Sequence, residues 1–173
     1  FGHDDTLAAM LCYATPRQQL WLACRRGDTA GAQAVATAHP GLIASLTPAD
    51  HRAVTDAAWN GDAAAVTTML AIGLDPAARG QDGGTALHCA AWQGAADIVA
   101  VLLRHPAAAT LLTTTDTSHD QPPLGWCCHG SLHGPRRDTH AQLARMLLQA
   151  GAEPTPFDAA EDVEAVIAGW GNG

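Results

Sequence analysis

The sequence predicts an all-α solenoid, in which short helix–turn–helix repeats stack on one another along one axis. The first observation is that the segment 57–70 returns 33 residues later as the segment 90–103, and each copy begins with Ala-Ala-Trp. The second is that a Gly in each copy, Gly61 and Gly94, is followed after eight and nine residues by two apolar side chains. The third is composition: only 5% of the chain is aromatic, and the alternating β-branched runs typical of sheets are few.

The second copy shows how one unit is expected to fold. Thr85 can accept a backbone N–H bond at the start of the first helix, after a sharp turn that Gly83 and Gly84 allow. Gly94 can end that helix in the left-handed conformation, which is costly for residues with a Cβ. The second helix then carries an apolar stripe that one repeat cannot bury alone. The stripe consists of Ile98, Val99, Leu102 and Leu103.

The segment 82–91 carries a family resemblance. It reads Asp-Gly-Gly-Thr-Ala-Leu-His-Cys-Ala-Ala, and with Gly94 and the apolar stripe it resembles the ankyrin repeat, whose signature is Asp-Gly-x-Thr-Pro-Leu-His-x-Ala-Ala. Ala86 stands where the family prefers Pro, and Ala is itself a good helix former. The resemblance covers residues 19–153. It implies hairpin-like tips along one edge, a concave face made of first helices and tips, and a His88 that hydrogen-bonds the backbone of the preceding turn.

When the repeats are aligned on the recurring Gly, they follow one another along the chain, which is therefore expected to form a single domain at 1–173. Gly27 marks a first, weaker repeat, and the spacing of Gly2, Leu7 and Met10 suggests a second helix whose first helix is missing. Because the chain lacks an initiating Met, we expect the natural protein to extend beyond Phe1. The expected units are a partial N-terminal unit at 1–18, repeats at 19–50, 51–83, 84–120 and 121–153, and a C-terminal cap at 154–173.

The fourth repeat is irregular, since 45 residues separate Leu103 from Leu148 where the regular spacing is 33. We expect about four extra residues near 107–115 and about eight within 129–138, where they form an inserted loop between the two helices. Loops held on a rigid scaffold are where binding specificity tends to reside. After this repeat, 158–168 is predicted to be an acidic terminal helix with a polar outer face.

Cysteine and histidine residues raise the question of a metal site. Four of the five Cys fall on first helices beside the small-residue positions, so we expect reduced, buried thiols. Cys127, Cys128 and three His residues lie within fourteen positions, but adjacent Cys side chains on a helix diverge by about 100° and cannot easily chelate one ion. We therefore expect no metal and no cofactor.

Catalytic motifs are weak. Ser131, His133 and Asp138 supply the residue types of a hydrolytic triad, but the Gly-x-Ser-x-Gly context of a nucleophile elbow is absent. The chain has no Lys, so it has no Gly-x-x-x-x-Gly-Lys phosphate loop. These observations favour a protein that is not an enzyme.

Charge and hydropathy limit the partners. A net charge of −8 and a pI near 5.4 argue against a duplex-binding surface, so no nucleic-acid partner is expected. All nine basic residues are Arg, which with the excess of Ala and Gly suggests a GC-rich, bacterial genome. No apolar run reaches the length of a membrane span and no signal peptide opens the chain. The prediction is a cytoplasmic monomer without a membrane partner.

The predicted function is binding of a partner protein through the concave face and the loops. Trp59 and Trp92 stand one period apart, and such Trp residues are typical of interface hot spots, although each could instead pack on its neighbour across the repeat interface. Two alternatives stay open: a regulatory or targeting arm of a larger enzyme, and a metal-dependent hydrolase centred on 127–140. The candidate partner-binding residues are Arg25, Arg26, Trp59, Asn60, Gln81, Asp82, Trp92, Gln93, His129, His133, Arg136 and Arg137.

Overall fold

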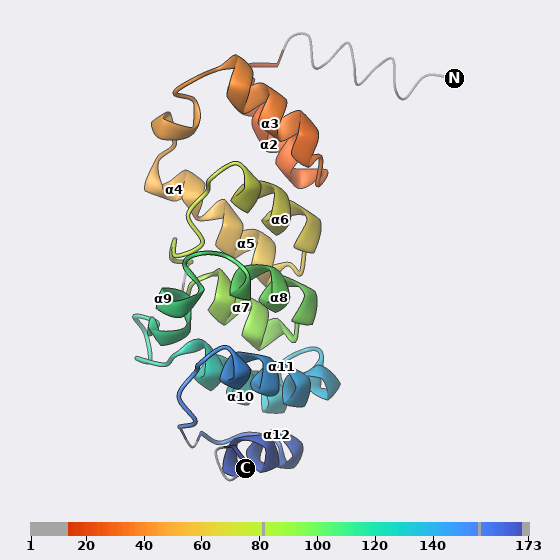
Figure 1. Ribbon diagram of the computed structural model, residues 1–173, viewed down its shortest axis with the longest axis vertical. Helices are drawn as coiled ribbons and strands as arrows, with labels where there is room; N and C mark the ends of the chain where they lie inside the picture. Colours follow the sequence, from red (N-terminus) through yellow and green to blue (C-terminus); the bar gives the residue numbers. More distant parts are fainter. Residues whose placement is uncertain (1–13, 81, 156, 171–173) are drawn as a thin grey trace, which may run out of the picture.

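The computed structural model describes residues 14–80, 82–155 and 157–170 (Figure 1). Within these ranges every regular element is a helix, as the repeat pattern predicts. None of the described helices is long and apolar enough to cross a membrane. The predicted N-terminal unit falls mainly on residues 1–13, which lie outside the described residues, as does Gln81.

Pairs of antiparallel helices follow one another along the long axis of the molecule (Figure 1). Consecutive first helices pack on one another from α5 to α7 to α10, and consecutive second helices from α6 to α8 to α11. The most N-terminal pair, α2 and α3, packs on α6. The first helices are α2 (Pro16–Arg25), α5 (Ala53–Trp59), α7 (Ala86–Gln93) and α10 (Pro123–His133), and the second helices are α3 (Thr29–Ala38), α6 (Ala63–Ala71), α8 (Ala96–Leu103) and α11 (His140–Gln149).

Shorter helices fill the connections. They are η1 (Ile43–Ser45), α4 (Pro48–His51), α9 (Ala108–Thr113), η2 (Arg137–Thr139) and the terminal α12 (Glu161–Ala168). The extra residues near 107–115 form α9, a helix that the repeat pattern does not predict. It exists because Leu111 and Leu112 are buried against the stack.

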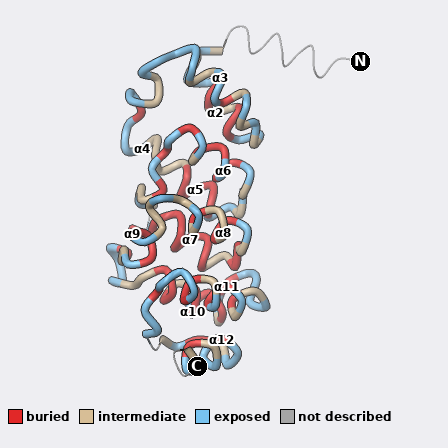
Figure 2. The backbone as a smooth tube through the Cα atoms, in the orientation of Figure 1, coloured by how far each residue is buried: buried red, intermediate tan, exposed pale blue. Residues whose placement is uncertain are grey.

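The third repeat has the predicted local structure. Thr85 and His88 form a capping box at the start of α7, and Gly94 ends the helix with a φ of 69°. Ala90 and Ala91 are fully buried, which lets α5, α7 and α10 approach closely. Buried residues form a continuous column through the stack (Figure 2).

His88 connects two repeats by hydrogen bonds. Its Nδ1 accepts the backbone N–H of Thr85 at 3.1 Å, and its Nε2 lies 3.0 Å from the carbonyl oxygen of Gln121 in the next repeat. Because a backbone N–H can only donate, the proton of the neutral ring belongs on Nε2. The bond around the preceding turn that the family resemblance implies is confirmed. Burial of the ring lowers the pKa of His88 to about 4.

The fourth repeat corrects the expected loop at 129–138. Helix α10 continues through His133, so His129 and His133 lie on a helix and not in a loop. The physical reason is the residue at the helix-ending position. Ser131 stands where the third repeat has Gly94, and a Ser does not favour the left-handed turn that stops α7.

The connection from α10 to α11 packs against the third repeat. The Thr139 hydroxyl donates to the carbonyl oxygen of Gly94 at 2.9 Å. The buried His140 ring places its two nitrogens 2.9 Å from the carbonyl oxygen of Arg136 and 3.2 Å from that of Trp92. The inserted residues therefore connect repeat four to the α7–α8 turn by hydrogen bonds.

The C-terminal helix covers the last repeat. Val163 and Ile167 are buried where α12 packs on α10 and α11, while Glu161 and Glu164 are exposed. The helix begins three residues later than the expected 158, because the N–H of Ala160 donates to the Ser131 hydroxyl at 2.8 Å with the chain still extended. The acidic outer face agrees with the expected cap.

Four thiols lie inside the stack, as expected: Cys24, Cys89, Cys127 and Cys128 are free and buried, whereas Cys12 is outside the described residues. Burial raises the pKa of Cys24 to about 11. These thiols therefore stay protonated at neutral pH and pack as small apolar groups.

A Cβ at Gly94 should destabilise the stack more than a Cβ at another left-handed Gly. It would lie 2.5 Å from Thr139 Oγ1 and 2.8 Å from Arg136 Cβ, whereas a Cβ at Gly73, where φ is 89°, meets nothing within 4 Å. We expect Gly73→Ala to lower the free energy of unfolding by about 1 kcal/mol and Gly94→Ala by about 2 kcal/mol or more. Urea unfolding followed by circular dichroism measures both, and equal losses would contradict the packing of the insertion on this turn.

Acid should weaken the His88 link. The pKa of His88 is lowered from 6.5 to about 4 by folding, so the unfolded chain takes up a proton first and stability is lost as the pH falls from 6.5 towards 4. Over this pH range, we expect the free energy of unfolding of the wild type to fall by on the order of 1–3 kcal/mol more than that of His88→Gln. The Gln side chain can still cap the helix but does not titrate. Urea unfolding at several pH values tests this, and parallel profiles would refute the assignment.

Candidate functional site

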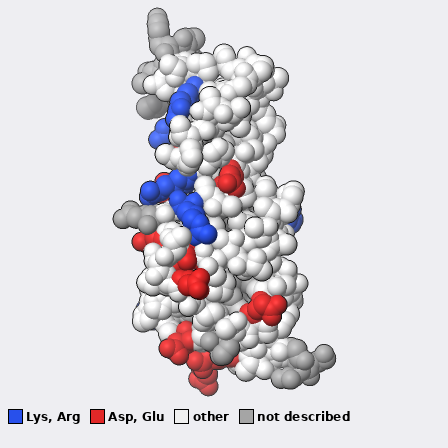
Figure 3. All heavy atoms as spheres, turned by 90° about the vertical axis from the view of Figure 1, so that its left-hand side faces the viewer, with Lys and Arg blue, Asp and Glu red and all other residues white. Residues whose placement is uncertain are grey.

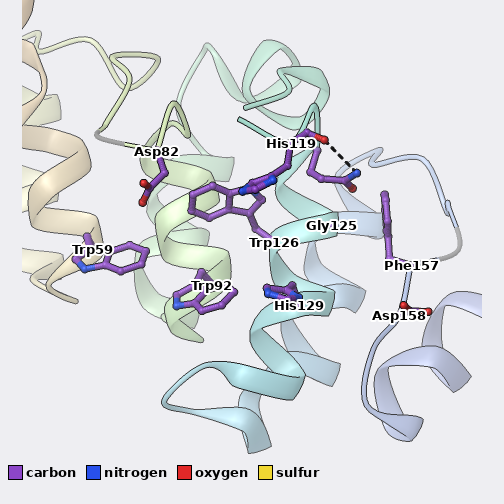
Figure 4. Close-up of a pocket in the computed structure, with 10 residues that line it drawn as sticks. Trp59, Asp82, Trp92, His119, Gly125, Trp126, His129, Phe157 and Asp158 are labelled. Atoms are coloured by element: carbon purple, nitrogen blue, oxygen red, sulfur yellow. Dashed lines mark hydrogen bonds between the residues drawn. The ribbon is translucent and has the colours of Figure 1, made fainter. Parts of the chain in front are cut away.

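A groove of about 490 Å³ opens across α5, α7, α10 and the segment before α12 (Figure 4). Its lining comes from three consecutive repeats and from the C-terminal segment. The lining residues are Trp59, Asp82, Trp92, His119, Gln121, Gly125, Trp126, His129, Phe157 and Asp158.

Three indoles form the centre of the groove, and we call Trp59, Trp92 and Trp126 the tryptophan row. Trp59 and Trp92 are stacked, with ring centroids 6.4 Å apart and 13° between the planes. Trp126 stands almost perpendicular to Trp92, at 6.4 Å and 75°, and the His129 ring lies 5.0 Å from Trp92. Trp59 remains 41% exposed and is the exposed large hydrophobic residue among those described.

The repeat geometry places the first two indoles. Trp59 ends α5, and Trp92 stands in the last turn of α7, directly after a buried pair of small residues in each case. His129 follows Cys127 and Cys128 at the same position of α10. Trp126 stands three residues before His129, one helical turn away on the same face.

Asp116 fixes the orientation of Trp126. Its buried carboxylate accepts the indole N–H of Trp126 at 2.8 Å, together with the backbone N–H groups of Ser118 at 2.8 Å, His119 at 2.6 Å and Gln121 at 3.1 Å. Burial alone would raise the pKa of Asp116, but these donors outweigh it and lower the pKa. The charged carboxylate thus holds the loop 116–121 and the third indole together.

Acidic groups stand at both ends of the groove. Asp82 lies beside Trp59 and Asp158 beside Phe157, and both are exposed (Figure 4). Burial, together with the nearby carboxylates of Asp82 and Asp56, raises the pKa of Cys89 to about 12. On the face that carries the loop tips, Arg side chains gather toward the N-terminal end and Asp and Glu side chains toward the C-terminal end (Figure 3).

Comparison with known families agrees with this architecture. A family model described as ankyrin repeats, in three copies, matches residues 54–158. That range is more than half of the chain. The chain belongs to the ankyrin repeat family. Ankyrin repeats are generally protein–protein interaction modules without enzymatic activity. No match to a curated protein was found.

The ankyrin stack brings together some of the residues expected to bind a partner. Trp59, Trp92, Asp82 and His129 line one groove. The others lie elsewhere on the described surface or outside it. Arg25 and Arg26 end α2, Asn60 and Gln93 stand at the ends of α5 and α7, His133 ends α10, Arg136 and Arg137 lie in the α10–α11 connection, and Gln81 is not among the described residues.

Six of the ten residues that line the groove are not among those predicted from the sequence. Trp126 occupies the position that Cys89 has in the preceding repeat. Its three-residue spacing from His129 is a signal in the sequence that both side chains lie on one face of a helix. Phe157 and Asp158 carry no repeat signal, because they follow the last repeat. Only the docking of the C-terminal segment brings them to the groove.

Some of the residues considered for metal or hydrolytic chemistry contact neighbouring groups of the stack. In the described part of the chain no group of three or more His, Cys, Asp or Glu is arranged to hold a metal ion. His129 and His133 form a pair on α10, with ring centroids 4.6 Å apart. The buried Ser131 hydroxyl donates to the carbonyl oxygen of Cys128 and accepts the N–H of Ala160, so it connects two helices.

Removing the Asp116 charge should destabilise the loop and free Trp126. We expect Asp116→Asn to lower the free energy of unfolding by about 1–3 kcal/mol, because one amide oxygen cannot replace a carboxylate that accepts from several donors. Asp138→Asn, which removes the same charge at an exposed position, serves as the control. Urea unfolding measures the stability, and Trp fluorescence reports the altered indole environment. Equal stability of both variants would contradict the role given to Asp116.

Proposed function

We propose that this ankyrin domain binds a partner protein and that the groove around the tryptophan row is the contact surface. The observation that carries the proposal is Trp59, which is 41% exposed although it stacks on Trp92. A Trp on the wall of a groove that stays partly in water leaves unfavourable apolar surface exposed, and a bound partner would bury that surface. Trp is also among the residues most enriched in binding hot spots.

The rigidity of the aromatic side chains also supports the groove as the contact surface. Trp92 is in contact with Trp59 on α5 and with Trp126 and His129 on α10. Trp126 is held by a hydrogen bond to Asp116. An aromatic surface that is already ordered loses little side-chain entropy when a partner binds. The groove volume of about 490 Å³ is large enough for a few residues of an extended segment or loop.

A regulatory or targeting arm of a larger enzyme is compatible with this proposal, since such an arm also acts by binding. The groove would then hold a segment of the same assembly. A metal-dependent hydrolase centred on 127–140 has no supporting observation among the described residues, because Ser131 is engaged in structural bonds and no cluster of metal ligands is present there.

The double change Trp59→Ala and Trp92→Ala should weaken partner binding by at least about 2 kcal/mol, or about 30-fold in Kd, while the helical content stays unchanged. The partner is first identified by comparing proteins captured by the wild type and by the double variant. It is then purified and titrated by calorimetry. Because both indoles lie on the surface of the groove, melting curves should show only a modest decrease of the Tm.

The matched control is Gln142→Ala with Arg145→Ala, two exposed residues on α11 away from the groove. This variant should bind with wild-type affinity. Unaltered affinity of the tryptophan variant, together with a large loss of thermal stability, would assign both indoles to packing and refute the proposed surface.

A further inference from the structure

The groove combines aromatic faces with carboxylates that lack a cation. Among the described residues, the side chains of Asp82 and Asp158 form no ion pair and no hydrogen bond. Both are exposed and line the same groove as the tryptophan row. In Figure 4 they stand at opposite ends of it, Asp82 beside Trp59 and Asp158 beside Phe157.

The two described cations nearest to Asp82, Arg52 and Arg79, already have other partners. A smaller hollow of about 260 Å³ shares Trp59, Asp82 and Trp126 with the groove, and Arg52 on its wall lies 3.4 Å from Asp56. Arg52 is paired with that carboxylate, and Arg79 donates to the carbonyl oxygens of Gly83 and Thr115, so neither forms an ion pair with Asp82.

Such a surface is complementary to a cationic side chain. Indole faces attract cations through the ring quadrupole, and Trp is the most effective of the aromatic residues. A guanidinium suits this site better than an ammonium, since it is planar, stacks on aromatic rings and donates two parallel hydrogen bonds to a carboxylate. It also sheds its hydration more readily.

We infer that the groove accepts a peptide segment of the partner that presents an arginine to the tryptophan row, with Asp82 as its counter-charge and Asp158 adding negative charge at the other end of the groove. This inference rests on the proposed function, and it specifies the chemistry of the occupant. The stacked faces of Trp59 and Trp92 and the perpendicular Trp126 form an aromatic corner for the guanidinium. Contacts along Phe157 and Gln121 accommodate the neighbouring peptide residues.

Random dodecapeptides displayed on phage provide the test, because they can be selected before the partner is identified. Phage that bind the double variant Trp59→Ala with Trp92→Ala are first removed, and the remaining phage are selected on the wild type, so that only ligands of the groove remain. We expect arginine to be enriched at one position of the selected peptides, above both lysine and its frequency in the input library. The best peptide is then synthesised with arginine or with citrulline, a neutral analogue of nearly the same shape. Citrulline should weaken binding at least tenfold in calorimetry.

Charge variants separate the groove from the general acidity of the protein. Asp82→Asn with Asp158→Asn should abolish the preference for arginine over citrulline. The control Glu153→Gln with Glu161→Gln removes the same charge from exposed sites outside the groove and should retain that preference.

The outcomes distinguish this inference from the proposed function. Peptides that depend on the two Trp residues but show no arginine enrichment would overturn the inference and leave the groove as a binding surface. Arginine peptides that bind the Asp82 and Asp158 variant as well as the wild type would also overturn it, as would a selection that yields no Trp-dependent peptide. The proposed function itself is decided by calorimetry on the purified partner.

Discussion

The close contact between consecutive first helices sets both the stacking of the repeats and the position of the groove. The pairs Ala57-Ala58, Ala90-Ala91 and Cys127-Cys128 are buried and have small side chains, so α5, α7 and α10 can approach one another. Larger residues at these positions would force the helices apart and expose the apolar stripes of the second helices. The same contact sets the spacing of the side chains that follow each pair, which are Trp59, Trp92 and His129. The groove is thus a consequence of the stacking geometry.

The irregular fourth repeat uses its additional residues for structure as well as for the site. Ser131 replaces the helix-ending Gly, so α10 gains a turn, and its hydroxyl then binds the N–H of Ala160 before α12. This bond holds the C-terminal segment near the groove, where Phe157 and Asp158 complete the lining. The rest of the insertion packs on the turn at Gly94. One substitution at a turn position therefore changes both the capping of the stack and the composition of its surface.

Two buried polar groups connect the loop 116–121 to the helices. His88 joins the Thr85 turn to the carbonyl oxygen of Gln121, and Asp116 joins the same loop to the indole of Trp126. The rings of His88 and Trp126 also meet edge to face, with centroids 5.3 Å apart. Because the His88 ring nitrogens and the Asp116 carboxylate oxygens all have partners, burial costs little and the loop is held in one conformation. The third indole is oriented as a result.

The helical class, the period, and the turn and small-residue positions of the regular repeats could be predicted from the order of the amino acids, because these features depend on local conformation and on spacing along the chain. Thr85, Gly94 and the Ala pairs could be assigned for this reason. The packing of residues 134–139 on repeat three and the placement of Phe157 and Asp158 in the groove are visible only in the folded chain. These features arise from contacts between segments that are distant in sequence and carry no repeat signal, so no local pattern could specify them.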